Sequence, residues 1–212
     1  MTSKKKLTIA IVSLSLVLFV VIASLVLVFA ALNATVKSGI TIKYTAKNVD
    51  AIVTISYKIT GQEEVALYAD AERTITALEF SPTDKTGIEK SFQPTGEINI
   101  GPTDKIVFTM AITNRHTTDN LYYDVNNLRE DYLQRENVYI NTGISHTKLA
   151  NPETDQFLSG DDVDGYIFND GRDIYTIKPS STIYCYFRVS IINDVLDAIL
   201  DAEFDFLLSS TY

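Results

Sequence analysis

The residues best suited to chemistry are a run of carboxylates late in the chain. Asp161, Asp162 and Asp164 stand beside Gly165, and carboxylate oxygens with a turn glycine are what a calcium loop requires. With Gly165 at the sixth position of a helix–loop–helix calcium loop, glycines would occupy the first and twelfth positions, where that loop needs acids. We therefore name Asp161, Asp162 and Asp164 as candidate calcium ligands, and a solvated acidic turn is the alternative.

The two histidines are the other candidates for chemistry. Neither His116 nor His146 stands in an H-x-x-x-H or His/Cys pattern, so a zinc site of the usual kind lacks ligands. The members of a Ser-His-Asp triad meet only in space, and the sequence leaves that arrangement open. No nucleophile elbow, glycine-rich phosphate loop or dinucleotide fingerprint accompanies the histidines. We expect both to be exposed loop residues, and we name no catalytic or cofactor-binding residue.

A single cysteine excludes an intrachain disulfide. Cys185 alternates in phase with Ile183, Phe187 and Val189, which predicts a position on the buried face of a strand. A reactive thiol is the less favoured interpretation, because no residue near Cys185 in the sequence would lower its pKa.

Period-two alternation of apolar and polar residues dominates the chain beyond residue 40. The long alternating stretches are 40–46, 53–59, 106–113, 182–189 and 202–208, and shorter ones are 74–80, 97–100, 138–141, 166–169 and 173–177. Alternation of this kind indicates strands that are buried on one face. We predict an all-β domain over residues 40–212, a jelly-roll or Ig-like β-sandwich of about eight or nine strands. Helical spacing predicts short helices at 126–134 and 193–200.

We interpret the N-terminal region as a membrane segment. Leu7 to Leu32 is a run of 26 residues without a charge, and a helix of that length spans about 39 Å, enough to cross a hydrocarbon core of about 30 Å. We predict a basic cytoplasmic start at residues 1–6, a single transmembrane helix in contact with the lipid bilayer at 7–32, and a short stalk at 33–39. The alternative is an export signal that is cleaved near Ala30, which would release a secreted protein.

Charge argues against one class of partner. The chain carries 18 Lys and Arg against 27 Asp and Glu, a net charge of −9. Three of these lysines precede the apolar run, so residues 33–212 carry 15 positive and 27 negative charges, a balance of −12. A body this acidic repels a phosphate backbone, and we expect no nucleic-acid binding.

The layout of the chain resembles one group of exported bacterial proteins. A basic start and a long apolar segment lead abruptly into residues 38–42 (SGITI), and a proline turn at Pro102 precedes a strand that ends in residues 112–114 (ITN). This layout is similar to the TasA/camelysin group of surface and matrix-fibre proteins. The resemblance implies a jelly-roll-like body behind an export segment, and it carries no functional residues over to this chain.

Two functions follow from these observations. The first is a non-enzymatic structural or adhesive protein on the cell surface, which could form homo-oligomers through its strand edges. The second is a secreted or tethered calcium-dependent ligand-binding module or surface hydrolase that uses the acidic residues 161–173. We favour the first, because the sequences of enzymes usually contain more catalytic motifs than this sequence does.

Overall fold

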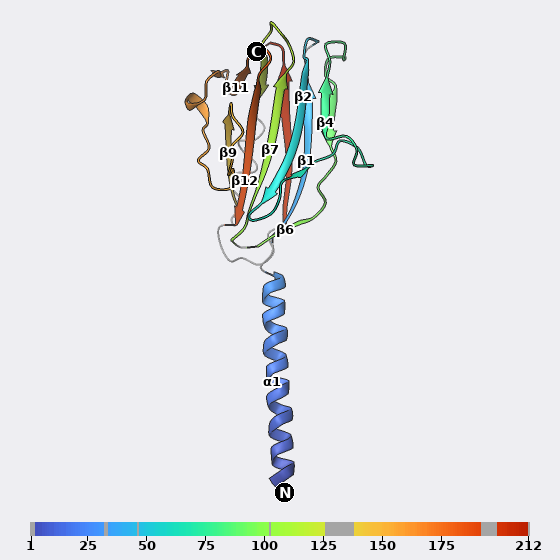
Figure 1. Cartoon of the computed structure of the whole chain (residues 1–212), viewed down its shortest axis with the longest axis vertical. Coiled ribbons are helices and arrows are strands. Elements are labelled where there is room, and N and C mark those ends of the chain that lie inside the picture. The colour runs from blue at the N-terminus through green and yellow to red at the C-terminus, as the bar shows by residue number, and fades with distance from the viewer. Residues whose placement is uncertain are drawn as a thin grey trace.

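A single long helix precedes the folded body. The computed structural model describes the backbone of residues 3–31, 34–45, 47–101, 103–125, 138–191 and 199–211. Helix α1 (Ser3–Ala31) includes residues 7–31 of the apolar run and projects from one end of the body (Figure 1). Its side chains are described for residues 11–25, where the large apolar ones are between 48 and 72% exposed. Within the residues described, no helix combines the length and hydropathy needed to cross a bilayer.

The body is a two-layered β-sandwich, which confirms the predicted all-β class. Sheet A contains, in spatial order, β10 (Tyr166–Asn169), β11 (Arg172–Ile177), β8 (Leu121–Asp124), β13 (Ile199–Ser209), β1 (Ala34–Tyr44) and β5 (Glu89–Phe92), and β6 (Ile98–Ile100) also pairs with β1. Sheet B contains β3 (Val65–Ala66), β2 (Ala51–Ile59), β7 (Lys105–Asn114), β12 (Thr182–Ile191) and β9 (Val138–Ser145), and β4 (Ala77–Phe80) also pairs with β2. These thirteen strands exceed the predicted eight or nine.

Strand β1 corrects the predicted stalk at residues 33–39. The strand begins at Ala34 and pairs in parallel with β13 along its length, from Thr35 opposite Ile199 to Tyr44 opposite Leu208. Residues 34–36 also pair antiparallel with β6. The stalk prediction is therefore wrong from residue 34 onward. Residues 34–39 lack a plain alternation of apolar and polar side chains, because an inward position of β1 holds a polar residue, Ser38, which is only 1% exposed.

The interior between the two sheets is apolar and rich in aromatic rings. Ile40 of sheet A and Val53, Phe108 and Phe187 of sheet B all belong to one buried cluster, as their alternation predicts. Phe204 of β13 lies among these rings, with its centroid 5.0 Å from that of Phe187 and 5.9 Å from that of Phe108. Burial of these side chains is the main stabilising contribution to the fold.

Sequence alternation located the long strands and missed three short ones. Strands β3, β5 and β8 were not predicted as strands. Two of them present few apolar residues, since β3 has only two residues and β5 buries only Phe92. The helix expected at 126–134 lies outside the described residues. So does most of the one expected at 193–200, whose last two residues, Ile199 and Leu200, begin β13.

Candidate functional site

The edge of sheet A is a tight hairpin formed by β10 and β11. Asn169 pairs with Arg172, and the two residues between them, Asp170 and Gly171, both have positive φ angles of 52° and 77°. Positive φ at both central positions defines a type I′ turn, for which Asp-Gly is a favoured sequence. Asp170 is therefore a turn residue. The Asp-Gly pair between two apolar stretches is the sequence signal for this hairpin.

The hairpin leaves β10 as a strand edge that carries an exposed aromatic ring. Among the described strands, β10 pairs only with β11. Phe168 is 61% exposed, and it lies opposite Asp173 on the same face of the sheet as Tyr166 and Tyr175. An edge strand presents unpaired backbone N–H and C=O groups to another chain. This edge, residues 166–169, is the strongest candidate for a contact site among the described strands.

The acidic residues named as calcium candidates precede β10. Asp161 and Asp162 lie in the short 3-10 helix η2 (Gly160–Asp162), and both are exposed. The carboxylate of Asp164 lies 2.7 Å from the Nζ atom of Lys178, whose hydrogen bond lowers the pKa of Asp164.

Among the described residues, no group of three or more His, Cys, Asp or Glu side chains is placed to hold a metal ion. The structure thus does not bring Asp161, Asp162 and Asp164 together as a ligand set, and the calcium site stays a prediction.

Both histidines bind backbone carbonyl groups. The Nε2 atom of His116 donates to the carbonyl oxygen of Asn48 at 2.6 Å, and the Nε2 atom of His146 donates to that of Asp164 at 3.0 Å. His146 is exposed as predicted, whereas the side chain of His116 is only 18% exposed, which corrects the expectation for that residue. Each ring holds two chain segments together through this bond.

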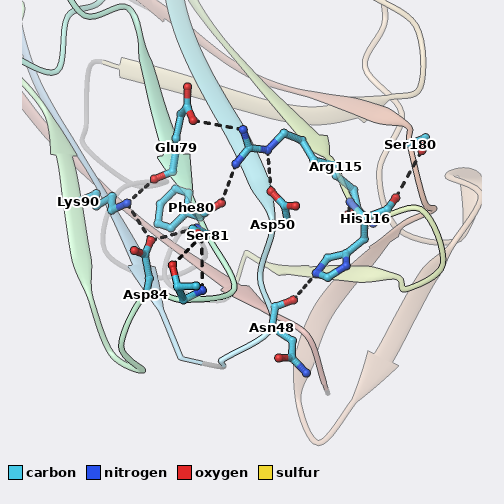
Figure 2. Close-up of polar contacts among 12 residues, drawn as sticks. Asn48, Asp50, Glu79, Phe80, Ser81, Asp84, Lys90, Arg115, His116 and Ser180 are labelled. Atoms are coloured by element: carbon cyan, nitrogen blue, oxygen red, sulfur yellow. Dashed lines mark hydrogen bonds and ion pairs between the residues drawn. The ribbon is translucent and has the colours of Figure 1, made fainter.

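A polar network joins the loops at the end of the sandwich remote from α1 (Figure 1), and its contacts are drawn in Figure 2. The guanidinium of Arg115 lies 2.6 Å from Asp50 and 3.2 Å from Glu79, and it donates to the carbonyl oxygen of Phe80 at 3.1 Å. These contacts connect the end of β7 with the start of β2 and with β4. Because each of the three guanidinium nitrogen atoms of Arg115 contacts another group of this chain, we assign Arg115 a structural role.

A second set of contacts fastens a strap, residues 148–158, across the outer face of sheet B. Arg188 is buried, and its Nε atom donates to the carbonyl oxygen of Pro152 at 3.0 Å. Its guanidinium carbon lies 4.1 Å from the ring centroid of Phe157, a cation–π arrangement. Glu153 forms an ion pair with Lys58 of β2 at 2.9 Å. This strap was not predicted from the sequence.

The Lys58–Glu153 pair is expected to make stability depend on pH. The hydrogen bond from Lys58 lowers the pKa of Glu153, so the pair stabilises the fold above the ordinary glutamate pKa of about 4.3 and is lost as pH falls through the lowered value. We expect Glu153→Gln to reduce the free energy of unfolding at pH 7, and this difference from the wild type should shrink as the pH falls from 7 to 3. Urea unfolding at a series of pH values measures this difference.

The control for this prediction is Glu97→Gln. Glu97 pairs with Lys37 at 3.4 Å, but its side chain is 66% exposed, and exposed pairs contribute little. An equal pH dependence in the two variants would contradict the assignment of Glu153.

Comparisons with known proteins add no family. No family model matches the chain, and no curated protein matches it. A solved structure that matches is the yeast delta-COP-I mu-homology domain, at 8% sequence identity and a TM-score of 0.20, over 84% of this chain and 96% of that chain. A likeness with so low a TM-score carries no argument about this chain.

Proposed function

We propose that the chain is a membrane-tethered surface protein whose β-sandwich acts by contact and not by catalysis. In this proposal α1 lies in the bilayer, and the sandwich stands outside the membrane. The observation that carries it is the apolar surface of α1, where eleven large side chains between Ile11 and Leu25 are exposed on all sides of the helix. A helix that is apolar all round requires an apolar environment, which a bilayer supplies.

The segment available to cross the bilayer is longer than the part whose side chains are described. The uncharged run extends from Leu7 to Leu32, and α1 continues to Ala31. Lys4, Lys5 and Lys6 stand directly before the run. A basic cluster at this position favours a cytoplasmic N-terminus, which would place the sandwich on the outer side.

The contact function is assigned to the β10 edge. No second described strand pairs with β10, and this open side together with the exposed ring of Phe168 suits the addition of a strand from another molecule. We propose that this strand is β10 of a second copy. Residues 160–173 carry five aspartates against one arginine, so two such edges repel each other through their charge. Self-association should therefore strengthen as added salt screens that repulsion.

Sedimentation of the detergent-solubilised full chain tests this contact. We expect a monomer–dimer equilibrium that shifts toward dimer at high salt, and Phe168→Lys should leave a monomer, because an edge lysine opposes strand pairing. The matched control is Ile75→Lys, since Ile75 is 50% exposed and lies away from β10. A strict monomer at every salt concentration would refute the self-association. A dimer that Phe168→Lys leaves intact would refute the assigned edge.

A further inference from the structure

Very little chain separates α1 from the sandwich. The uncharged run ends at Leu32, and β1 begins at Ala34. Three residues that are fully extended span at most about 11 Å, so the Cα atom of Thr35 lies no farther than that from the Cα atom of Leu32. Figure 1 shows α1 leaving the body at the end where β6 lies.

The first residues of β1 are held in place by strands on both sides. Thr35 pairs with Ile199 of β13 and with Asn99 of β6. The hydroxyl of Thr35 also donates to the side-chain oxygen of Asn99 at 3.0 Å, and the next residue, Val36, is 0% exposed. Releasing this part of β1 would break backbone hydrogen bonds and expose apolar surface. The sandwich therefore gains no distance from α1 by unpairing its first strand.

This end of the sandwich is close to the bilayer if α1 spans it, as the proposed function requires and as this inference presupposes. The run of 26 uncharged residues is longer than a hydrocarbon core of about 30 Å needs. An overlong apolar helix tilts or thickens the bilayer around it, and both responses keep Leu32 near the hydrocarbon boundary. The headgroup layer beyond that boundary is about 5–8 Å thick. A reach of about 11 Å ends within this layer or directly above it.

The surface at this end is neutral and polar. We call residues 34–36 of β1 and 98–100 of β6 the rim. The rim sequences, ATV and INI, contain no charged residue. Asn99 is exposed and Thr35 is half-buried, and their amide and hydroxyl groups can hydrogen-bond to the phosphate and ester oxygens of lipids. The charged residues that flank the rim, Lys37 and Glu97, form an ion pair with each other at 3.4 Å.

We propose that the rim lies against the phospholipid headgroups of the bilayer that holds α1. The short connection imposes this contact, and charge does not. Residues 33–212 carry a balance of −12, so an anionic bilayer repels the sandwich as a whole. Because the connection allows no withdrawal, the contact should be the same on neutral and on anionic bilayers.

Tryptophan fluorescence measures this contact, because the chain contains no tryptophan and a single introduced one reports on a single position. The full chain is reconstituted into phosphatidylcholine vesicles with and without a lipid that carries a nitroxide quencher on its headgroup. We expect the nitroxide to lower the emission of Asn99→Trp at least about twofold, since position 99 lies near the headgroups. Thr117→Trp is the matched control. It is exposed in the loop that follows β7 at the remote end, and it should keep its emission.

Glu97→Trp is a second reporter, which serves if the substitution at Asn99 disturbs β6. Glu97 is 66% exposed, so a larger side chain has room there. It stands two residues before Asn99, about 7 Å farther from the start of β1. Its emission should therefore be quenched less than that of Asn99→Trp and more than that of Thr117→Trp.

A longer connection separates the proposed cause from other attractions. A Gly-Ser insertion of about six residues after Leu32 adds about 12–15 Å of reach, and it should reduce the quenching of Asn99→Trp while the chain still floats with the vesicles. Phosphatidylglycerol at low salt should leave the quenching unchanged in the chain without the insertion. It should reduce the quenching further in the chain with the insertion, because the acidic sandwich can then move away from the anionic surface.

Three results would overturn the proposal. The first is the absence of quenching for both reporters in vesicles with which the chain floats, which would leave the tether intact and refute the contact alone. The second is quenching that the insertion does not change, which would mean that the short connection is not its cause. The third is a chain that does not float with the vesicles, which would refute the tether itself and the contact with it.

Discussion

Replacing Phe204 with alanine is expected to lower the free energy of unfolding by about 3–5 kcal/mol, the range for a buried phenylalanine. Phe204 is 1% exposed and comes from β13, yet its ring packs against Phe187 and Phe108 of the opposite sheet. The substitution therefore opens a cavity between the two sheets, where both layers lose contacts. Urea unfolding of the full chain in detergent, followed by tyrosine fluorescence, measures the loss.

Phe168→Ala is the matched control for this substitution. It removes the same side chain from a position that is 61% exposed, and surface substitutions usually change stability by no more than about 0.5 kcal/mol. Similar losses in the two variants would mean that the rings of β13 do not lie between the sheets, which would contradict the sandwich.

Placing two arginines in α1 is expected to abolish membrane association. Leu18 and Val21 lie near the middle of the uncharged run, and an arginine at the centre of a spanning helix costs about 2.5–3.5 kcal/mol on the insertion scale. Leu18→Arg combined with Val21→Arg therefore costs on the order of 5–7 kcal/mol if both costs add. We expect the wild type to stay in the membrane pellet after alkaline carbonate washing, and the double variant to leave it.

The control for the arginines is the apolar pair Leu18→Met and Val21→Ile, which keeps the hydropathy of α1 and should stay in the pellet. Release of the wild type by carbonate would contradict the anchor and favour the cleaved export signal. Retention of the double arginine variant would show that α1 is not the segment that holds the protein on the membrane.

Strict alternation was enough to predict the long strands, because each of them buries one face over many residues. In β7 and β12 the inward positions are occupied by residues such as Phe108 and Phe187, and the period of two is plain in the sequence. The start of β1 could not be predicted in this way. Its inward position at Ser38 is polar, and its pairing partner β13 lies at the other end of the chain.

The sites could be predicted less well than the fold. The three aspartates of the calcium hypothesis are neighbours in the sequence, but local spacing does not decide where their carboxylates point. The contact between Tyr123 and Cys185 joins two residues that come from different sheets and meet only after both layers have formed. Nothing in the sequence near either residue marks this contact, since Cys185 alternates like any inward position of a strand and β8, which carries Tyr123, was not predicted.

Labelling with a membrane-impermeant maleimide on intact cells tests most directly whether the sandwich stands outside the membrane. The native thiol of Cys185 is 1% exposed, so the wild-type protein supplies a low background. We expect Glu72→Cys, at an exposed position of the sandwich, to be labelled on intact cells, and Thr2→Cys to be labelled only after lysis. Labelling of Thr2→Cys on intact cells, with Glu72→Cys protected until lysis, would contradict the account.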